Sequence, residues 1–84
     1  MALYLISYDL IGKSYDQYED LINELRRLGA QKVLLSQWAW RSSDTAVAIR
    51  DHLRKFMHPN DRILVNEIGA TWASWNILID LNKV

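Results

Sequence analysis

The 84-residue sequence contains no cysteine, one proline and three glycines, and its ten basic residues balance its ten acidic residues. Without cysteine, disulfide scaffolds, zinc ribbons and thiol nucleophiles are excluded. The zero net charge lacks the positive field that is typical of proteins dedicated to nucleic acids or membrane surfaces, so such a partner would be bound locally. The chemistry that remains is that of carboxylates, hydroxyls, histidines and hard cations.

Long hydrophobic runs are absent as well. No stretch of about 18 consecutive apolar residues occurs, so we expect no membrane-spanning helix and no membrane partner. The apolar amino-terminal segment reaches Asp9 too soon for a signal peptide and has no basic segment before it. We therefore expect a cytoplasmic protein in which residues 1–84 form a single domain.

Large aromatic residues, in contrast, are plentiful for so short a chain, with four tryptophans and four tyrosines. A chain of this length buries only about 60% of its unfolded surface, which leaves a small core in which to place them. Tryptophan and tyrosine are enriched at protein interfaces. We therefore expect a two-fold homodimer.

The first half of the chain has clear helix and strand signals. Residues 3–10 are an apolar run that suits a strand buried on both faces. Ser14 and Gln17 match a capping box that begins a helix, and Gly29 stands where a left-handed cap ends it. Residues 30–40 then change to β-like alternation, which predicts either a strand pair or one long bent strand.

The second half repeats the pattern. A second helix begins within residues 42–45 and ends before His58 and Pro59, and residues 62–68 and 72–81 are predicted to form two further strands. The order predicts an α+β fold, a ferredoxin-like βαββαβ sandwich with an extra C-terminal strand. Two helices would cover one face of the antiparallel sheet and leave the other face open, and we expect the last strand to contribute to the homodimer.

The most prominent polar residue is Asp9, a carboxylate that ends the hydrophobic first strand just before a glycine-containing loop. Rigid strand ends often present functional carboxylates, although such a residue can also simply bind loop amides. If the first strands of two protomers meet at the dimer axis, two Asp9 carboxylates face each other. Because magnesium takes one or two carboxylates and keeps waters for phosphate oxygens, Asp9 is the predicted metal ligand and catalytic residue.

Four basic residues are predicted to contact nucleic acid: Lys13, Arg41, Arg50 and Arg54. Arg50 and Arg54 are four residues apart and share a helix face, where they would either contact phosphates or simply favour the helix dipole. Trp38 and Trp40, next to Arg41, are either a stacking platform for bases or part of the core or dimer interface. The two histidines lack a partner at metal-ligand spacing, so zinc is not expected.

Three segments of the chain carry a family resemblance. Residues 4–10, Tyr-Leu-Ile-Ser-Tyr-Asp-Leu, resemble the first strand of the small CRISPR-associated family that acts with the spacer integrase and has been described as a metal-dependent endonuclease. Residues 35–38, Leu-Ser-Gln-Trp, are similar to the family's Ser-x-Phe segment, and residues 58–63, His-Pro-Asn-Asp-Arg-Ile, resemble its approach to the fourth strand. The order of elements matches over nearly the whole chain, and the virulence-associated protein D toxins share this architecture.

The resemblance implies a ferredoxin-like homodimer with Asp9 at a magnesium site, which is either a nuclease acting on RNA or DNA or a nucleic-acid-binding adaptation subunit with an integrase-type protein partner. The family commonly has a second acidic residue and paired arginines where this chain has Gly-Lys-Ser-Tyr-Asp at residues 12–16. That difference and the zero net charge favour an alternative, a non-catalytic dimeric interaction or scaffold protein of the same fold. A small-molecule-sensing module is a third hypothesis, for which the sequence shows no polar pocket.

Overall fold

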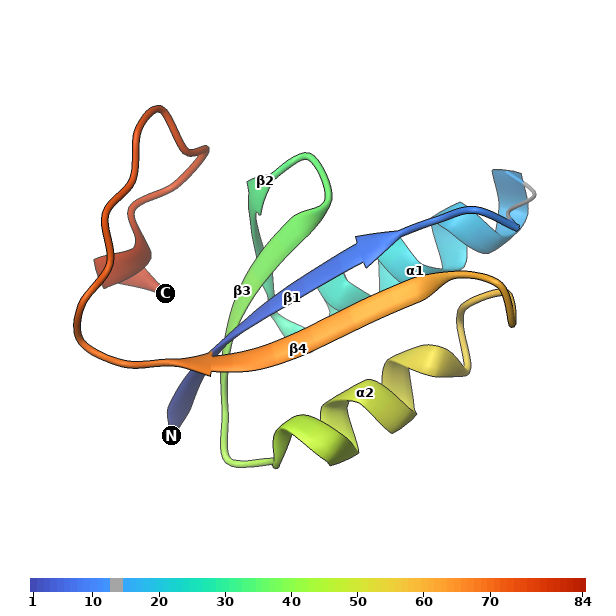
Figure 1. The fold of residues 1–84 in the computed structure, drawn as a ribbon, viewed down its shortest axis with the longest axis horizontal. Coiled ribbons are helices and arrows are strands. Elements are labelled where there is room, and N and C mark those ends of the chain that lie inside the picture. The colour runs from blue at the N-terminus through green and yellow to red at the C-terminus, as the bar shows by residue number, and fades with distance from the viewer. Residues whose placement is uncertain (13–14) are drawn as a thin grey trace.

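The structure, a computed structural model, describes residues 1–12 and 15–84, without the side chains of residues 15–17. The predicted capping box of Ser14 and Gln17 therefore lies outside what is described. The elements in chain order are β1 (Ala2–Asp9), α1 (Tyr15–Leu28), β2 (Gln31–Leu34), β3 (Gln37–Ser42), α2 (Ala46–Arg54), β4 (Arg62–Ile68) and the short 3-10 helix η1 (Leu81–Lys83). Figure 1 shows their arrangement.

The four strands form one antiparallel sheet in the order β2-β3-β1-β4. β1 lies in the interior of the sheet, where Leu5 pairs with Ala39 of β3 on one side and Asn66 of β4 on the other. Each helix connects two strands that have a third strand between them, which is the split βαβ arrangement. The fold is thus compatible with a ferredoxin-like α+β fold, and the predicted order of the first six elements is confirmed.

Residues 30–42 form a strand pair and not one bent strand. A turn at Leu35 and Ser36 separates β2 from β3, and the two strands pair antiparallel. The backbone N–H of Tyr8 donates to the carbonyl of Ser36 at 3.1 Å. This bond ties the turn to the end of β1, where Asp9 lies.

Both helices pack on the same face of the sheet. Tyr4, Ile6 and Tyr8 of β1 meet apolar side chains of the two helices in one core cluster, with Leu25 from α1 and Leu53 from α2 completely buried. Successive strand residues point to opposite faces, so the alternate residues of β1 supply this core.

The helix ends follow the expected local chemistry. Gly29 has φ +90°, the left-handed conformation predicted for it after α1. Thr45 caps α2 by accepting a hydrogen bond from the N–H of Ala48 at 3.1 Å. No helix within the described residues combines the length and the apolar character that a bilayer span requires.

The predicted C-terminal strand over residues 72–81 is wrong. The segment is irregular up to η1, and it turns back toward β2 and β3 (Figure 1). Asn76 has φ +54°, which interrupts any extended backbone there, and the N–H of Leu78 donates to the carbonyl of Val33 at 3.0 Å. This segment therefore runs over the sheet instead of extending it as a further strand.

The prediction that the second sheet face stays open is wrong for part of that face, because the C-terminal segment covers it. Leu81 is buried with Leu3, Val33 and Ala39, and partly buried side chains of the C-terminal segment pack around them. The C-terminal segment covers the amino-terminal half of β1, around Leu3 and Leu5. The other half, toward Asp9, remains accessible on this face.

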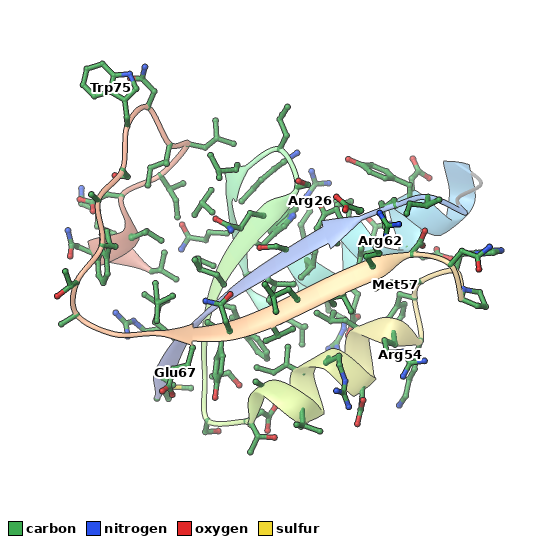
Figure 2. The ribbon with its side chains drawn as sticks, viewed as in Figure 1. Arg26, Arg54, Met57, Arg62, Glu67 and Trp75 are labelled. Carbon is green, nitrogen blue, oxygen red and sulfur yellow. The ribbon has the colours of Figure 1, made fainter. Side chains whose placement is uncertain are left out.

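The four tryptophans do not gather on one surface, as a common dimer interface would require. Trp38 is buried in the helix-side core, where a stacking platform for bases is excluded, and Trp40 packs partly buried beside it. Trp72 packs against the second core. Only Trp75 is largely exposed, at 86%, on the C-terminal segment (Figure 2).

Candidate functional site

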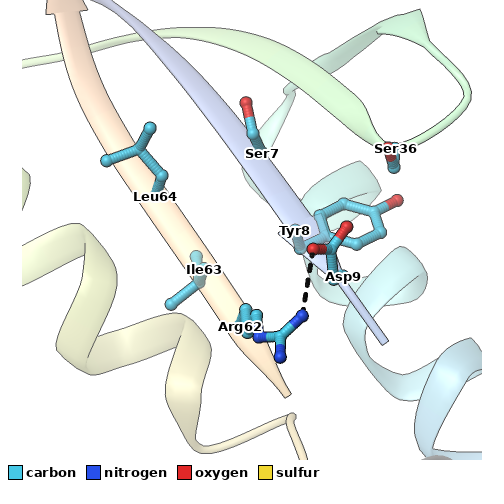
Figure 3. Close-up of a pocket in the computed structure, with 7 residues that line it drawn as sticks. All are labelled: Ser7, Tyr8, Asp9, Ser36, Arg62, Ile63 and Leu64. Atoms are coloured by element: carbon cyan, nitrogen blue, oxygen red, sulfur yellow. Dashed lines mark ion pairs between the residues drawn. The ribbon is translucent and has the colours of Figure 1, made fainter. Parts of the chain in front are cut away.

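Asp9 stands at the end of β1 on the sheet face that the helices do not cover. Tyr8 points into the helix-side core, so Asp9, the next residue, points the other way. Arg62 lies directly opposite it in β4, and its Nη1 is 3.8 Å from Oδ2 of Asp9 (Figure 3). Both side chains are mostly exposed, Asp9 at 67% and Arg62 at 73%. The ion pair is accessible to solvent and to ligands.

A shallow hollow of about 230 Å³ surrounds this pair (Figure 3). Ser7 and Leu64 continue its floor along the two strands, and Ser36 closes one side. The hydroxyl of Ser7 accepts a hydrogen bond from Nε2 of Gln37 at 2.9 Å. The hollow therefore offers a carboxylate for a cation and a guanidinium for a phosphate oxygen within the same few ångströms.

A tyrosine supports this site from the opposite face. The hydroxyl of Tyr8 accepts a hydrogen bond from Nε1 of Trp38 at 3.0 Å, in a buried position. Burial raises the pKa of Tyr8 and outweighs the hydrogen bond from Trp38, which lowers it. Tyr8 thus stays neutral and fixes the end of β1, so that Asp9 is held on a rigid strand.

Asp61 binds the loop that follows Asp9. Its Oδ1 accepts from the N–H groups of Ile11 at 2.7 Å and Gly12 at 3.0 Å, and its Oδ2 accepts from the N–H of His58 at 2.9 Å. Burial alone would raise the pKa of Asp61, but these backbone donors outweigh it and hold the pKa below its usual value. Asp61, and not Asp9, has the loop-binding role that the sequence suggested as the simple alternative for Asp9.

The three predicted basic residues that the structure describes, Arg41, Arg50 and Arg54, do not gather around Asp9. Lys13 lies outside the described residues. Arg41 is opposite Leu3, roughly 20 Å along β1 from Asp9, and its Nε donates to the carbonyl of Val84 at 2.5 Å. Arg50 and Arg54 are on α2, on the other side of the sheet. Arg62, which the sequence does not place beside Asp9, is the basic residue that the described part of the chain brings to the site.

A single protomer offers few metal ligands. No group of three or more histidine, aspartate or glutamate side chains that could hold a metal ion occurs in the described part of the chain. Asp9 is the carboxylate that lines the hollow. A magnesium ion at this position would therefore need the second Asp9 of a dimer, or waters and substrate oxygens, to complete its six ligands.

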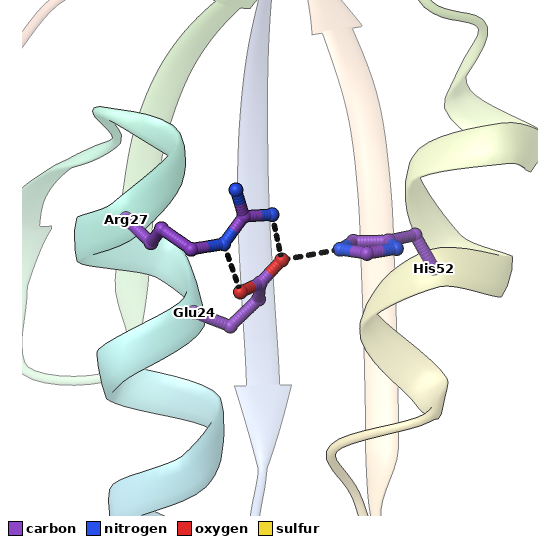
Figure 4. A network of polar contacts seen from close by, with 3 residues as sticks. All are labelled: Glu24, Arg27 and His52. Atoms are coloured by element: carbon purple, nitrogen blue, oxygen red, sulfur yellow. Dashed lines mark hydrogen bonds and ion pairs between the residues drawn. The ribbon is translucent and has the colours of Figure 1, made fainter.

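A second polar cluster, which the sequence analysis missed, joins the two helices. Glu24 of α1 is only 6% exposed, and its oxygens accept two hydrogen bonds from Arg27 at 2.6 Å each (Figure 4). Nε2 of His52 in α2 contacts the same carboxylate. The hydrogen bonds from Arg27 lower the pKa of Glu24 to about 2, with a smaller contribution from His52, against the effect of burial. The three-residue spacing of Glu24 and Arg27 was the available signal.

Comparison with models of protein families and with solved structures gives no significant match to this chain.

Proposed function

We propose that this chain is a homodimeric, magnesium-dependent nuclease subunit of the CRISPR-associated adaptation type, with Asp9 of each protomer as metal ligand and catalytic residue. The observation that carries the proposal is the position of Asp9. It is an exposed carboxylate at the end of an interior strand, on the sheet face away from the helices and beside an arginine. Substrates would be RNA or DNA, and an integrase-type protein would be the partner.

The accessible half of the second sheet face is the proposed dimer surface. Leu64 is 62% exposed and lies across from Ser7, next to the Asp9 and Arg62 pair. A two-fold axis through this region buries Leu64 against its copy and places the two Asp9 carboxylates near each other. The repulsion between these carboxylates favours a cation between them.

The residues of the hollow fit a hard cation, because their donor atoms are carboxylate and hydroxyl oxygens. Bound magnesium would supply Lewis-acid stabilisation of a phosphate and an activated water. Asp9 would hold the ion, and the guanidinium of Arg62 would bind and orient a non-bridging phosphate oxygen. Tyr8 and Asp61 would keep the strand end and the following loop in position.

The test is cleavage of labelled RNA and DNA by the wild type and by Asp9→Ala, with and without magnesium. We expect magnesium-dependent cleavage that Asp9→Ala reduces by about 100-fold or more, as loss of a metal ligand does. Asp20→Ala is the matched control, because Asp20 is an exposed carboxylate on α1, and it should cleave like the wild type. Equal activity in all three proteins, or none in any, would contradict the catalytic role of Asp9.

The ion pair between Asp9 and Arg62 favours a second function, a non-catalytic dimeric interaction or scaffold protein of the same fold. Arg62 already neutralises the carboxylate, so a resident metal is not needed to balance its charge. In that case the wild type would not cleave nucleic acid with magnesium but would still be a dimer by light scattering. The same set of proteins therefore decides between the two functions.

A further inference from the structure

A larger cleft lies on the helix side of the sheet, where α2 ends and the connection to β4 begins. Its volume is about 550 Å³, within the range of pockets that hold small molecules. We propose that this cleft binds a nucleotide, with the phosphate on Arg54, Lys55 and His58 and the base against Met57 and Ile63. The site is independent of Asp9, which is on the opposite face of the sheet.

The acidic residues of the cleft are already satisfied. Asp51 accepts two hydrogen bonds from Arg50, at 3.0 and 2.9 Å. Asp61 accepts three from backbone N–H groups of the two adjoining loops. Both bonds from Arg50 end on Oδ1 of Asp51, and neither carboxylate forms an ion pair with Arg54 or Lys55 within the described residues.

The remaining basic groups are free for a ligand. Within the described ranges, 1–12 and 15–84, the side chains of Arg54 and Lys55 form no ion pair, and both residues are exposed. The helix dipole favours basic residues at this end of α2, which by itself accounts for their presence. The last carbonyls of the helix, however, already accept hydrogen bonds from the backbone N–H groups of residues 55–57, so they do not need the side chains of Arg54 and Lys55 as donors. The formal charges of the lining balance, with Arg54 and Lys55 against Asp51 and Asp61, but the two basic side chains are the ones without a protein partner in the described part of the chain.

His58 is held in a defined orientation at the cleft. Its Nδ1 accepts a hydrogen bond from the N–H of Asn60 at 3.1 Å, so the neutral ring carries its proton on Nε2. The ring also packs against Gly12 so closely that a Cβ there would be 2.2 Å from Nδ1. Because the ring is fixed before a ligand arrives, little conformational entropy is lost when Nε2 donates to a phosphate oxygen.

The apolar part of the cleft suits the flat face of a base. Met57 and Ile63 are half-buried, and Figure 2 shows Met57 and Arg54 near the end of α2. A thioether contacts aromatic rings favourably, and guanidinium and ammonium groups bind phosphate oxygens. A phosphate attached to a planar base matches this combination. A free mononucleotide and the phosphorylated end of a strand share that chemistry.

The experiment is titration of the ¹⁵N-labelled protein with adenosine 5′-monophosphate, inorganic phosphate and adenosine, followed by amide chemical shifts. We expect the monophosphate to shift amides of residues 54–63 and to bind at least 5-fold more tightly than phosphate or adenosine. Arg54→Gln should weaken its binding about 5- to 10-fold. Arg26→Gln removes the same charge from an exposed position on α1, outside the cleft, and it should change the affinity less than 2-fold.

Equal weakening by the two arginine variants, or adenosine binding as tightly as its monophosphate, would overturn the proposal. A short oligonucleotide with and without a 5′-phosphate distinguishes the two sources of nucleotide. Stronger shifts with the phosphorylated form support a strand end, and shifts with the mononucleotide alone support a free ligand. Absence of shifts at residues 54–63 with every phosphorylated probe refutes the site. Asp9→Ala should bind the monophosphate like the wild type, so this test is separate from that of the nuclease.

Discussion

Gly12, in the loop after β1, lies directly against the ring of His58 in the loop before β4. A Cβ at this position would be 2.2 Å from Nδ1 and 2.7 Å from Cγ of His58, inside the closest approach of real atoms. Asp61 ties the backbones of both loops together, so the clash is relieved only if the ring rotates and gives up its hydrogen bond from the N–H of Asn60. We expect Gly12→Ala to lower the free energy of unfolding by about 1 to 3 kcal/mol, measured by urea denaturation.

Gly69 provides the matched control. A Cβ at Gly69 has no atom within 4 Å, and its φ is not positive. Gly69→Ala should therefore leave stability unchanged or raise it slightly, since alanine restricts the unfolded chain. If both alanine variants behave alike, the close approach of Gly12 to His58 does not exist in solution.

Glu24 gives the protein a specific acid sensitivity. Its pKa in the folded protein is about 2, below the ordinary value of 4.5, because Arg27 and His52 bind the charged form. The resulting stabilisation is complete above about pH 4.5 and is lost as the pH falls toward 2. We expect Glu24→Gln to be about 1 to 2 kcal/mol less stable than the wild type at pH 7, with the difference shrinking below pH 4.5. Urea denaturation at a series of pH values measures this.

Glu19→Gln is the control for this pH series. Glu19 is an exposed residue of the same helix, so its replacement changes the charge of α1 by the same amount without touching the cluster. Its stability difference from the wild type should be small at every pH. A constant difference between Glu24→Gln and the wild type from pH 7 to pH 2.5 would show that the carboxylate is not held in its charged form.

At the scale of elements, the C-terminal segment acts as a cover for half of the second sheet face. Leu81 is its anchor, buried with Leu3, Val33 and Ala39. We expect Leu81→Ala to cost about 2 to 3 kcal/mol of unfolding free energy, through lost burial and the cavity that remains. Leu78→Ala, at a side chain that is mostly exposed, should cost less than about 1 kcal/mol. Thermal or urea denaturation of both variants makes the comparison.

The sequence predicts correctly those helices and strands that have a strong hydrophobic periodicity and recognisable residues at their ends. α1, α2 and the four strands were placed from hydrophobic spacing and from glycine and proline at their ends. Residues 72–81 also show an alternation of apolar and polar residues, but their apolar side chains do not share one strand face in the structure. Trp75 faces solvent, Asn76 takes a left-handed conformation, and Ile77 and Ile79 pack on the sheet. Ser74 and Asn76 are turn-forming residues, and their presence within this segment argues against a continuous strand.

The polar sites show the same limit. The position of Asp9 at a strand end could be predicted, because it depends on the strand alone. Arg62 could not be paired with it, since the pairing follows from the register of β1 with β4. Glu24 and Asp61 each have one partner three residues away, Arg27 and His58, but the partners that join two elements, His52 and Ile11, are 28 and 50 residues away and follow no local pattern.

At the scale of the whole molecule, the accessible half of the second sheet face is the surface that the proposed dimer would bury. Leu64→Glu places a charge at its centre and should convert the dimer to a monomer in light scattering at micromolar concentration, with an unchanged circular dichroism spectrum. Val47→Glu is the control, because Val47 is similarly exposed on α2. A monomeric wild type, or a dimer that survives Leu64→Glu, would contradict a dimer through this face.

The interior position of β1 also has a consequence for how the protein is made. β1 is made before the other three strands of its sheet, yet its neighbours are β3 and β4, and Leu3 pairs with Ile68. Until β4 has been made, this apolar strand has only one of its two neighbours. The sheet therefore closes only after β4 has followed, and during that interval β1 is exposed to chaperones and to aggregation with other nascent chains.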